Sequence, residues 1–286
     1  MGLGVDERRP LAQVEDRPHP VYNDAVSMRL LAIKIGNSNV NVGVFEGADL
    51  LAHWRIHTEI DQTADEYALV LNDWLSQAGL RDGWRGAIVV SVVPPLTDTF
   101  QELCRRYIEV EPLIAGPKLR TGMPIRYQDP RSLGADRLVA AVAAKVRYGA
   151  PLIVIDFGTA TTFNVVNRAG EFVGGAIAPG LVLAADALYE STAQLPRIDL
   201  TVPPRAIATN TIEGMQSGIL FGYLGLIEGM VRRLREEMHE PNARVVATGG
   251  LARLIAPHTR ILDHVEPDLI MHGLRILFEM NVGEAS

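Results

Sequence analysis

The sequence contains two similar stretches, Ile33-Lys34-Ile35-Gly36-Asn37-Ser38-Asn39 and Ile155-Asp156-Phe157-Gly158-Thr159-Ala160-Thr161. In each stretch an apolar run carries a charged residue near its end, a glycine turn with small polar residues follows, and a second extended run begins. An apolar run bounded by such a turn is typical of a buried strand that enters a β-hairpin. We therefore predict a duplicated α/β protein whose two related halves each begin with a hairpin and face each other across a cleft.

The pattern around these stretches predicts alternating strands and helices. Apolar runs indicate strands, and apolar residues at helical spacing indicate helices. Strands are expected at 29–35, 39–45, 50–57, 87–93, 152–157, 161–167, 171–177 and 244–247. Helices are expected after a Thr63-Ala64-Asp65-Glu66 capping box and at 96–107, 134–148, 211–239 and 268–280.

The chain divides into an N-terminal half, residues 28–133, and a C-terminal half, residues 134–286, with the boundary lying within 113–150. Residues 1–27 contain three prolines, scattered charges and no periodicity, so we expect a disordered extension, with Met28 as a candidate original start. The helix expected at 211–239 carries glycines at 214, 218, 222, 225 and 229. Because glycine lets another backbone approach closely, this spacing favours a packed helix pair or a homodimer contact.

The composition limits the class of protein. The 286 residues include 27 Lys and Arg against 34 Asp and Glu, a net charge of −7. This balance argues against nucleic acid or an anionic membrane as a partner. The single cysteine, Cys104, excludes an intramolecular disulfide and fits a cytoplasmic protein. No uncharged apolar stretch reaches the roughly 18 residues of a membrane span.

The glycine turns at 36–38 and 158–160 have two possible roles. They can be plain hairpin turns, or their backbone N–H groups can approach phosphates, since glycine lacks a Cβ atom. Two facing turns could clamp a nucleoside triphosphate, with Thr248-Gly249-Gly250 as a third contact. Neither a Walker A sequence nor a G-x-G-x-x-G unit is present, so P-loop and Rossmann binding are not indicated.

Two aspartates are candidates for chemistry. Asp136 opens the expected helix at 134–148, where a carboxylate either offsets the helix dipole or accepts a proton from a substrate hydroxyl. Its neighbour Arg137 could bind the carboxylate of an anionic substrate. Asp156 ends a strand that should be buried on both faces, and a buried carboxylate needs a partner or a cation.

Several motifs, in order, resemble one family, the type III pantothenate kinases of the acetate and sugar kinase/Hsp70/actin superfamily. The resemblance covers roughly residues 28–281. Its motifs include S-V-V-P-P-L-T at 91–97, G-A-D-R at 134–137, I-D-F-G-T-A-T-T at 155–162, G-G-A-I-A-P-G at 174–180 and N-T-I-E-G-M-Q-S-G at 210–218. The resemblance implies two RNase H-like halves of the actin-like ATPase type around a nucleotide cleft. It also implies transfer of the ATP γ-phosphoryl group to the 4′-hydroxyl of pantothenate, the first step of coenzyme A biosynthesis.

The resemblance further implies roles for individual residues. The residues expected to bind ATP are Lys34, Ile35, Gly36, Asn37, Ser38, Asn39, Val40, Asn41 and Thr159. The residues expected to bind pantothenate are Tyr127, Gly134, Ala135, Asp136, Arg137 and Thr211. Among them, Asp136 would be the general base and Arg137 an anion anchor, and Thr211 would reach pantothenate across a homodimer interface. Asp156 would bind a monovalent cation, K⁺ or NH₄⁺, and Mg²⁺ would accompany ATP.

Lys34 departs from the family pattern, in which the first glycine motif begins with Asp. It is one of only three lysines, with Lys118 and Lys145. A protonated lysine cannot bind Mg²⁺, although it can contact phosphates as a point charge. Two functions therefore remain open at this point: an active pantothenate kinase, and a catalytically impaired homologue that acts as a ligand-binding or regulatory accessory protein.

Overall fold

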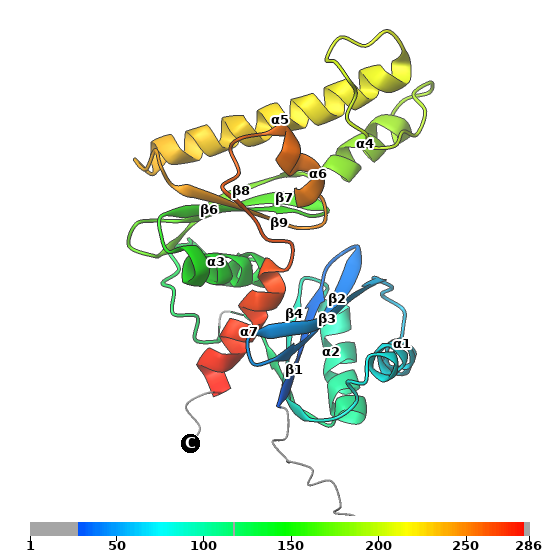
Figure 1. The fold of residues 1–286 in the computed structure, drawn as a ribbon, viewed down its shortest axis with the longest axis vertical. Coiled ribbons are helices and arrows are strands. Elements are labelled where there is room, and N and C mark those ends of the chain that lie inside the picture. Colours follow the sequence, from blue (N-terminus) through cyan, green and yellow to red (C-terminus); the bar gives the residue numbers. More distant parts are fainter. Residues whose placement is uncertain (1–27, 117, 283–286) are drawn as a thin grey trace, which may run out of the picture.

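The structure, a computed structural model, describes residues 28–116 and 118–282. The extension expected at 1–27 lies outside the described residues. The described chain forms two five-stranded mixed sheets with helices packed against them (Figure 1), which confirms the α/β class. No helix in this part of the chain is long and apolar enough to cross a membrane.

The two sheets have the same strand order and the same strand directions. The first has the order β3-β2-β1-β4-β5, and the second, taken from the matching edge, has the order β8-β7-β6-β9-β10. In each sheet the first three strands of the sequence are antiparallel neighbours, and the last two are parallel to the central strand. The first sheet consists of β1 (Arg29–Ile35), β2 (Asn39–Glu46), β3 (Asp49–His57), β4 (Trp84–Ser91) and β5 (Pro112–Ile114). The second consists of β6 (Leu152–Phe157), β7 (Ala160–Val166), β8 (Phe172–Pro179), β9 (Arg244–Thr248) and β10 (His264–Val265).

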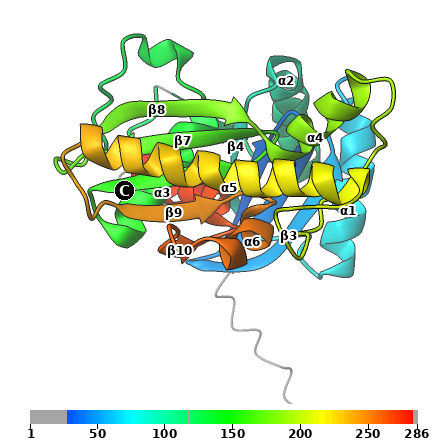
Figure 2. The same ribbon diagram turned by 90° about the horizontal axis from the view of Figure 1, so that it is seen from above.

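Helices cover the outer face of each sheet. Two helices pack on the first sheet, α1 (Ala64–Gln77) and α2 (Pro94–Leu103). Three pack on the second, α4 (Leu181–Glu190), α5 (Thr211–Glu237) and α6 (Ala252–Ile255). Figure 2 shows α5 lying over the second sheet, in roughly the same direction as its strands.

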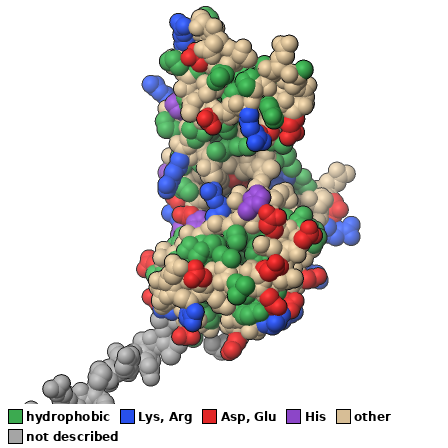
Figure 3. All heavy atoms as spheres, turned by 90° about the vertical axis from the view of Figure 1, so that its right-hand side faces the viewer, with side chains coloured by type: hydrophobic (Ala, Val, Ile, Leu, Met, Phe, Trp, Pro, Cys, Tyr) green, Lys and Arg blue, Asp and Glu red, His purple; other side chains and the backbone are tan. Residues whose placement is uncertain are grey.

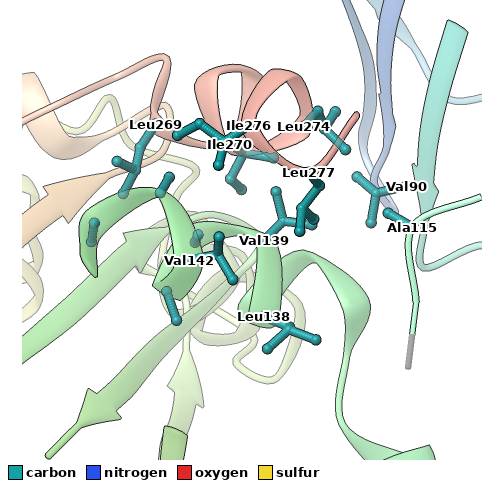
Figure 4. Close-up of a cluster of buried hydrophobic side chains, with 14 of the residues drawn as sticks. Val90, Ala115, Leu138, Val139, Val142, Leu269, Ile270, Leu274, Ile276 and Leu277 are labelled. Atoms are coloured by element: carbon teal, nitrogen blue, oxygen red, sulfur yellow. The ribbon is translucent and has the colours of Figure 1, made fainter. Parts of the chain in front are cut away.

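A central layer of two helices lies between the sheets. It contains α3 (Ala135–Tyr148) and α7 (Leu269–Val282), which pack against each other and share one hydrophobic core with both sheets. Figure 4 shows Leu274 and Leu277 of α7 lying between Val139 of α3 and Val90 of the first sheet. Because α3 and α7 contribute to a core that both sheets share, the division into residues 28–133 and 134–286 stays a prediction.

The alternation of side chains along the central strands explains these layers. Successive side chains of a strand point to opposite faces. In β1, Leu30 and Ala32 face the central layer, whereas Leu31, Ile33 and Ile35 face α1 and α2. In β6, the even-numbered Leu152 and Val154 likewise face the central layer, and the odd-numbered apolar residues face α5. Every apolar residue of both strands is therefore buried, as their continuous apolar character predicts.

Most of the expected elements are confirmed, and the capping box at Thr63 forms as predicted, with Glu66 bonding back to the Thr63 backbone N–H. The expected start of the second helix at residue 96 is wrong by two residues: α2 begins at Pro94, because proline fits the first turn of a helix. The sequence pattern gave no indication of β5, β10 or α4. The two strands are too short to show alternation, and α4 buries only Leu181 and Ala185, so its apolar residues form no clear stripe.

Candidate active site

The charged residues at the ends of the two central strands meet each other. Lys34 continues the face of Leu30 and Ala32, and Asp156 continues the face of Leu152 and Val154, so both side chains point toward the middle of the molecule. The Lys34 Nζ lies 3.5 Å from the Asp156 Oδ2, and their side chains are 19% and 12% exposed. The two equivalent positions of the repeated motif thus form one largely buried ion pair.

The two glycine turns also touch. The Ser38 hydroxyl and the Thr159 hydroxyl are 2.7 Å apart and share a hydrogen bond. Thr58 stabilises the first turn with two hydrogen bonds. Its hydroxyl donates to the Gly36 carbonyl at 2.7 Å, and its N–H donates to the Ser38 carbonyl. In Figure 3 the surface is hollowed between the two parts of the molecule, and basic and histidine side chains lie at its rim.

The residues predicted to bind ATP fall into two groups. Ile35 and Val40 are fully buried in the outer core of the first sheet, so only their backbone could face a ligand. Asn41 is the cross-strand neighbour of Lys34, and side chains of such neighbours share a face. Lys34, Asn39 and Asn41 therefore present polar side chains on the central face of the sheet, beside the turn at 36–38.

Asp136 lies in the first turn of α3 and faces the ion pair. Burial raises the pKa of its carboxyl group, the positive charge of Lys34 lowers it, and the negative charge of Asp156 raises it. The Asp136 Oδ1 accepts a hydrogen bond of 2.8 Å from the Arg137 N–H. Three charged groups from three different elements, β1, β6 and α3, are thus electrostatically coupled at one place.

Arg137 is buried next to Asp136, with only 8% of its surface exposed. Its Nε donates to the Asn164 Oδ1 at 2.6 Å, and its Nη2 is buried without a hydrogen-bond partner among the residues that the structure describes. An unpaired buried guanidinium nitrogen is costly unless an acceptor reaches it. This nitrogen is therefore a ready donor for an anionic group of a ligand.

Tyr127 and Arg137 meet on the ring of Phe172. The Arg137 guanidinium lies over this ring at 5.9 Å from its centroid, and the Tyr127 and Phe172 ring centroids are 6.2 Å apart. The predicted pantothenate-binding residues Tyr127, Asp136 and Arg137 are thus brought to one end of α3. Thr211 is not: it is exposed at the start of α5, and no hydrogen bond or ring contact joins it to these three within the described part of the chain.

Gly134 and Ala135 form the start of α3. Gly134 is the N-cap residue, and a Cβ atom added to it would lie 2.9 Å from the Asp136 Oδ1. Gly134 therefore leaves space for the Asp136 carboxylate. Ala135 follows as the first helical residue and is partly buried.

Sequence reasoning assigned no role to Asn164 and Gly175, which shape this site, and it assigned Gly249 only to a nucleotide contact. Asn164 holds Arg137, and Gly175 leaves room for it: a Cβ atom there would lie 3.3 Å from the Arg137 Nη2 and 1.7 Å from the Phe163 carbonyl oxygen. A Cβ atom at Gly249 would lie 2.3 Å from the Asp156 Oδ1. The two adjacent glycines within a strand, Gly174 and Gly175, were the signal in the sequence for the close approach of Arg137 and Phe163 to Gly175.

Comparisons with known proteins agree with this arrangement. The sequence profile of type III pantothenate kinases matches residues 30–233. The type III pantothenate kinase of Syntrophotalea carbinolica is 49% identical over 255 residues, which cover 89% of this chain and 100% of that protein. The type III pantothenate kinase of Geobacter sulfurreducens is 48% identical over 253 residues, which cover 88% of this chain and 99% of that protein.

Solved structures show similar folds at low sequence identity. A Baf family transcriptional activator from Campylobacter jejuni has a TM-score of 0.57 at 18% identity, over 87% of this chain and 97% of that one. The (R)-2-hydroxyglutaryl-CoA dehydratase component A of Acidaminococcus fermentans has a TM-score of 0.51 at 12% identity, over 87% and 95% of the two chains. These likenesses concern the fold alone. By the profile and by identities near 48% over nearly nine-tenths of its length, the chain belongs to the type III pantothenate kinase family.

Proposed function

We propose that this protein transfers the γ-phosphoryl group of ATP to the 4′-hydroxyl of pantothenate, the first step of coenzyme A biosynthesis, in the cytoplasm. The observation that carries the proposal is the pair at the start of α3. Asp136 is a carboxylate whose pKa is raised by burial, and next to it the buried Arg137 Nη2 has no hydrogen-bond partner in the described part of the chain. Pantothenate has a hydroxyl and a carboxylate, the two groups that such a pair would bind.

The nucleotide would lie in a cleft between two duplicated, RNase H-like halves. The matching order and directions of the two sheets support the duplication. The two touching turns would hold the phosphates, with backbone N–H groups of residues 36–41 on one side and Thr159 on the other. The hydroxyls of Ser38 and Thr159, 2.7 Å apart, would exchange their mutual hydrogen bond for bonds to phosphate oxygens.

In the transfer step, the 4′-oxygen of pantothenate forms a bond to the γ-phosphorus. The bond from that phosphorus to the β–γ bridging oxygen breaks, and ADP leaves. The hydroxyl proton passes to Asp136, whose raised pKa makes it a better proton acceptor than an ordinary carboxylate. Arg137 holds the pantothenate carboxylate, which fixes the distance from the hydroxyl to the phosphate. Positioning of this kind is the main requirement of phosphoryl transfer.

The expected metal ions fit this chain to different degrees. Among the described residues, no three His, Cys, Asp or Glu side chains lie together as a metal-binding group. Mg²⁺ would therefore be held mainly by the phosphates of ATP, where it would offset their charge. A free K⁺ or NH₄⁺ ion at Asp156 does not fit the structure as it stands, because the Lys34 ammonium already lies beside the Asp156 Oδ2.

A homodimer formed through α5 would complete the site. Along α5, a Cβ atom added to Gly218, Gly222 or Gly225 would meet nothing within 4 Å. Beside these glycines lies an apolar groove between α4 and α5. Leu188 in its lining is 39% exposed, and Val182 and Leu183 of α4 and Ile212 of α5 are about half exposed. A second copy packed on this face would cover these residues, and Thr211 at the start of α5 could then reach the partner's pantothenate.

The dimer is tested by Gly222→Lys, which places a charge on that face. Sedimentation velocity should show a dimer for the unmodified protein and a monomer for the variant. Leu69→Lys, on the exposed side of α1, is the control and should remain dimeric, since Leu69 is 73% exposed on the other half. A variant Gly222→Lys that stays dimeric would place the interface elsewhere.

The activity is tested by pantothenate-dependent formation of ADP. Asp136→Asn should lower kcat by a factor on the order of 10² to 10⁴, because the variant lacks the proton acceptor. Asp98→Asn on α2 is the control and should keep full activity, because Asp98 is exposed and interacts electrostatically with Arg105. Equal activity of Asp136→Asn and the unmodified protein would show that Asp136 is not the base.

A further inference from the structure

Lys34 and Asp156 occupy equivalent places in the two sheets, and their opposite charges are paired. Each residue is the second-last of its central strand, and each points to the central layer. The Lys34 Nζ is 3.5 Å from the Asp156 Oδ2, and more than four-fifths of each side chain is buried. The site thus carries its own singly charged nitrogen cation next to the carboxylate at which a monovalent cation is expected.

The other oxygen of Asp156 is enclosed by backbone. The Asp156 Oδ1 is buried and has no hydrogen-bond partner within residues 28–116 and 118–282. Cβ atoms added at Gly249 and Gly158 would lie 2.3 and 3.7 Å from it, so the backbones after β9 and β6 crowd this oxygen. One oxygen therefore faces an ammonium and the other faces main chain, and a separate ion would have to displace one of them.

The net charge of Lys34, Asp136 and Asp156 also argues against a separate cation beside Asp156. Lys34, Asp136 and Asp156 together carry one net negative charge, whereas an aspartate at position 34 would give three. The Lys34 charge acts on both carboxylates, since it forms the ion pair with Asp156 and favours the ionised form of Asp136. A second cation in the same place would be repelled by the ammonium.

We propose that the Lys34 ammonium is a built-in replacement for the monovalent cation at Asp156, so that this chain binds nucleotide and turns over without added K⁺ or NH₄⁺. The ammonium has three N–H donors, and those not directed at Asp156 can serve phosphate oxygens. The proposal rests on the proposed function for its nucleotide part. Its structural part, that position 34 fills the cation site, is independent of catalysis.

The first test is thermal unfolding of the nucleotide-free protein in KCl and in tetramethylammonium chloride at equal ionic strength. The unmodified protein should melt at the same temperature in both salts. Lys34→Gln, which keeps a polar side chain one atom shorter but removes its charge, should melt lower in tetramethylammonium and be stabilised by K⁺ specifically. Lys118→Gln, an exposed control, should show no salt-specific shift. A K⁺-specific rise in the melting temperature of the unmodified protein would overturn the proposal.

The second test repeats the two salts with pantothenate-dependent turnover and with calorimetric binding of a non-hydrolysable ATP analogue. Turnover and affinity of the unmodified protein should change less than about twofold, while Lys34→Gln should lose about tenfold in tetramethylammonium and recover in K⁺ or NH₄⁺. A tenfold loss by the unmodified protein would overturn the role of Lys34 but leave the kinase function intact. Absence of any phosphorylation, with the melting pattern as expected, would overturn the function and leave the role of Lys34 intact.

Discussion

The first and second sheets share one topology but differ in charge at the ends of their central strands. β1 carries Lys34 where β6 carries Asp156, and the two side chains form an ion pair. Two acidic residues at these positions, as the family resemblance implies, would repel each other and need a cation between them. Because the two sheets share one topology and their central strands end at the same place, equivalent positions meet, and a change of charge at one position alters the chemistry of the other.

The two halves also differ in what they contribute beside the strand ends. The second half supplies the groups suited to an anionic substrate, since Asn164 of β7 and Phe172 of β8 both contact Arg137. The first half supplies a polar strip next to its glycine turn, with Asn39 and Asn41 beside Lys34. We therefore predict that substitutions beside Arg137 affect the binding of pantothenate, and that substitutions beside Lys34 affect the binding of ATP.

Reversing the charges at the two equivalent positions should have the largest effect. Lys34→Asp alone puts a third carboxylate beside Asp136 and Asp156, and Asp156→Lys alone puts two ammonium groups together. Each should lower the free energy of unfolding by up to about 3 kcal/mol, because it leaves a largely buried charge without its partner. The double variant should recover at least half of that loss in urea denaturation. Simple additivity of the two single effects would show that the pair contributes no coupling.

Removing the anion anchor of the second half should affect pantothenate and not ATP. Arg137→Gln should raise the KM for pantothenate by about a hundredfold, since a charge-assisted contact with its carboxylate is lost, and leave the KM for ATP nearly unchanged. Arg131→Gln is the matched control, because the Arg131 side chain is 89% exposed. An equal rise in both KM values would contradict the assignment of Arg137 to pantothenate.

Substitution of Gly249 tests the close approach of the main chain after β9 to the Asp156 carboxylate. Gly249 directly follows β9, its φ is 91°, and a Cβ atom there would lie 2.3 Å from the Asp156 Oδ1, whereas β4 ends at Ser91 and is followed by Val92. Gly249→Ala should lower the free energy of unfolding by about 1–3 kcal/mol, through both backbone strain and displacement of Asp156. Gly116→Ala, where a Cβ atom would meet nothing, should be nearly neutral. A stable Gly249→Ala variant would show that Asp156 is free to move.

The smallest expected effect is a shift in the pH dependence of kcat, because Lys34 and Asp156 move the pKa of Asp136 in opposite directions. Burial raises the pKa of Asp136 above its ordinary value of 3.8, Lys34 lowers it and Asp156 raises it. The acid limb of the kcat profile should therefore lie above pH 3.8 and move further up in Lys34→Gln, because the lowering charge is gone. A carboxyl group with a raised folded pKa stabilises the protein at low pH and loses that contribution as pH rises through the folded pKa. Asp136→Asn should accordingly gain stability relative to the unmodified protein as pH rises; a constant difference would contradict the raised pKa.

The sequence was sufficient for the elements with strong periodicity or a clear cap. The apolar runs of β1 and β6, the capping box of α1 and the glycine end of α3 at Gly149 all form as predicted. The sequence also indicated the two turns that the structure brings into contact. These signals are local, because each depends on neighbouring residues in the chain.

The remaining features depend on contacts between distant segments, which a single sequence does not show. The ion pair of Lys34 with Asp156 follows from strand parity only once the two sheets are known to face each other. Asn164 is an ordinary polar residue within a strand until Arg137 is placed against it. The packing of α7, near the end of the chain, against β1 and β4 of the first sheet likewise depends on tertiary contacts between distant segments.

The central claim is that this chain is an active pantothenate kinase with Lys34 in place. The most direct test is mass-spectrometric detection of phosphorylated pantothenate after incubation with ATP and Mg²⁺, for the unmodified protein and for Lys34→Asp. The account predicts product from the unmodified protein, without a requirement for K⁺. No product from the unmodified protein, together with product from Lys34→Asp, would contradict it and identify the chain as a catalytically impaired homologue.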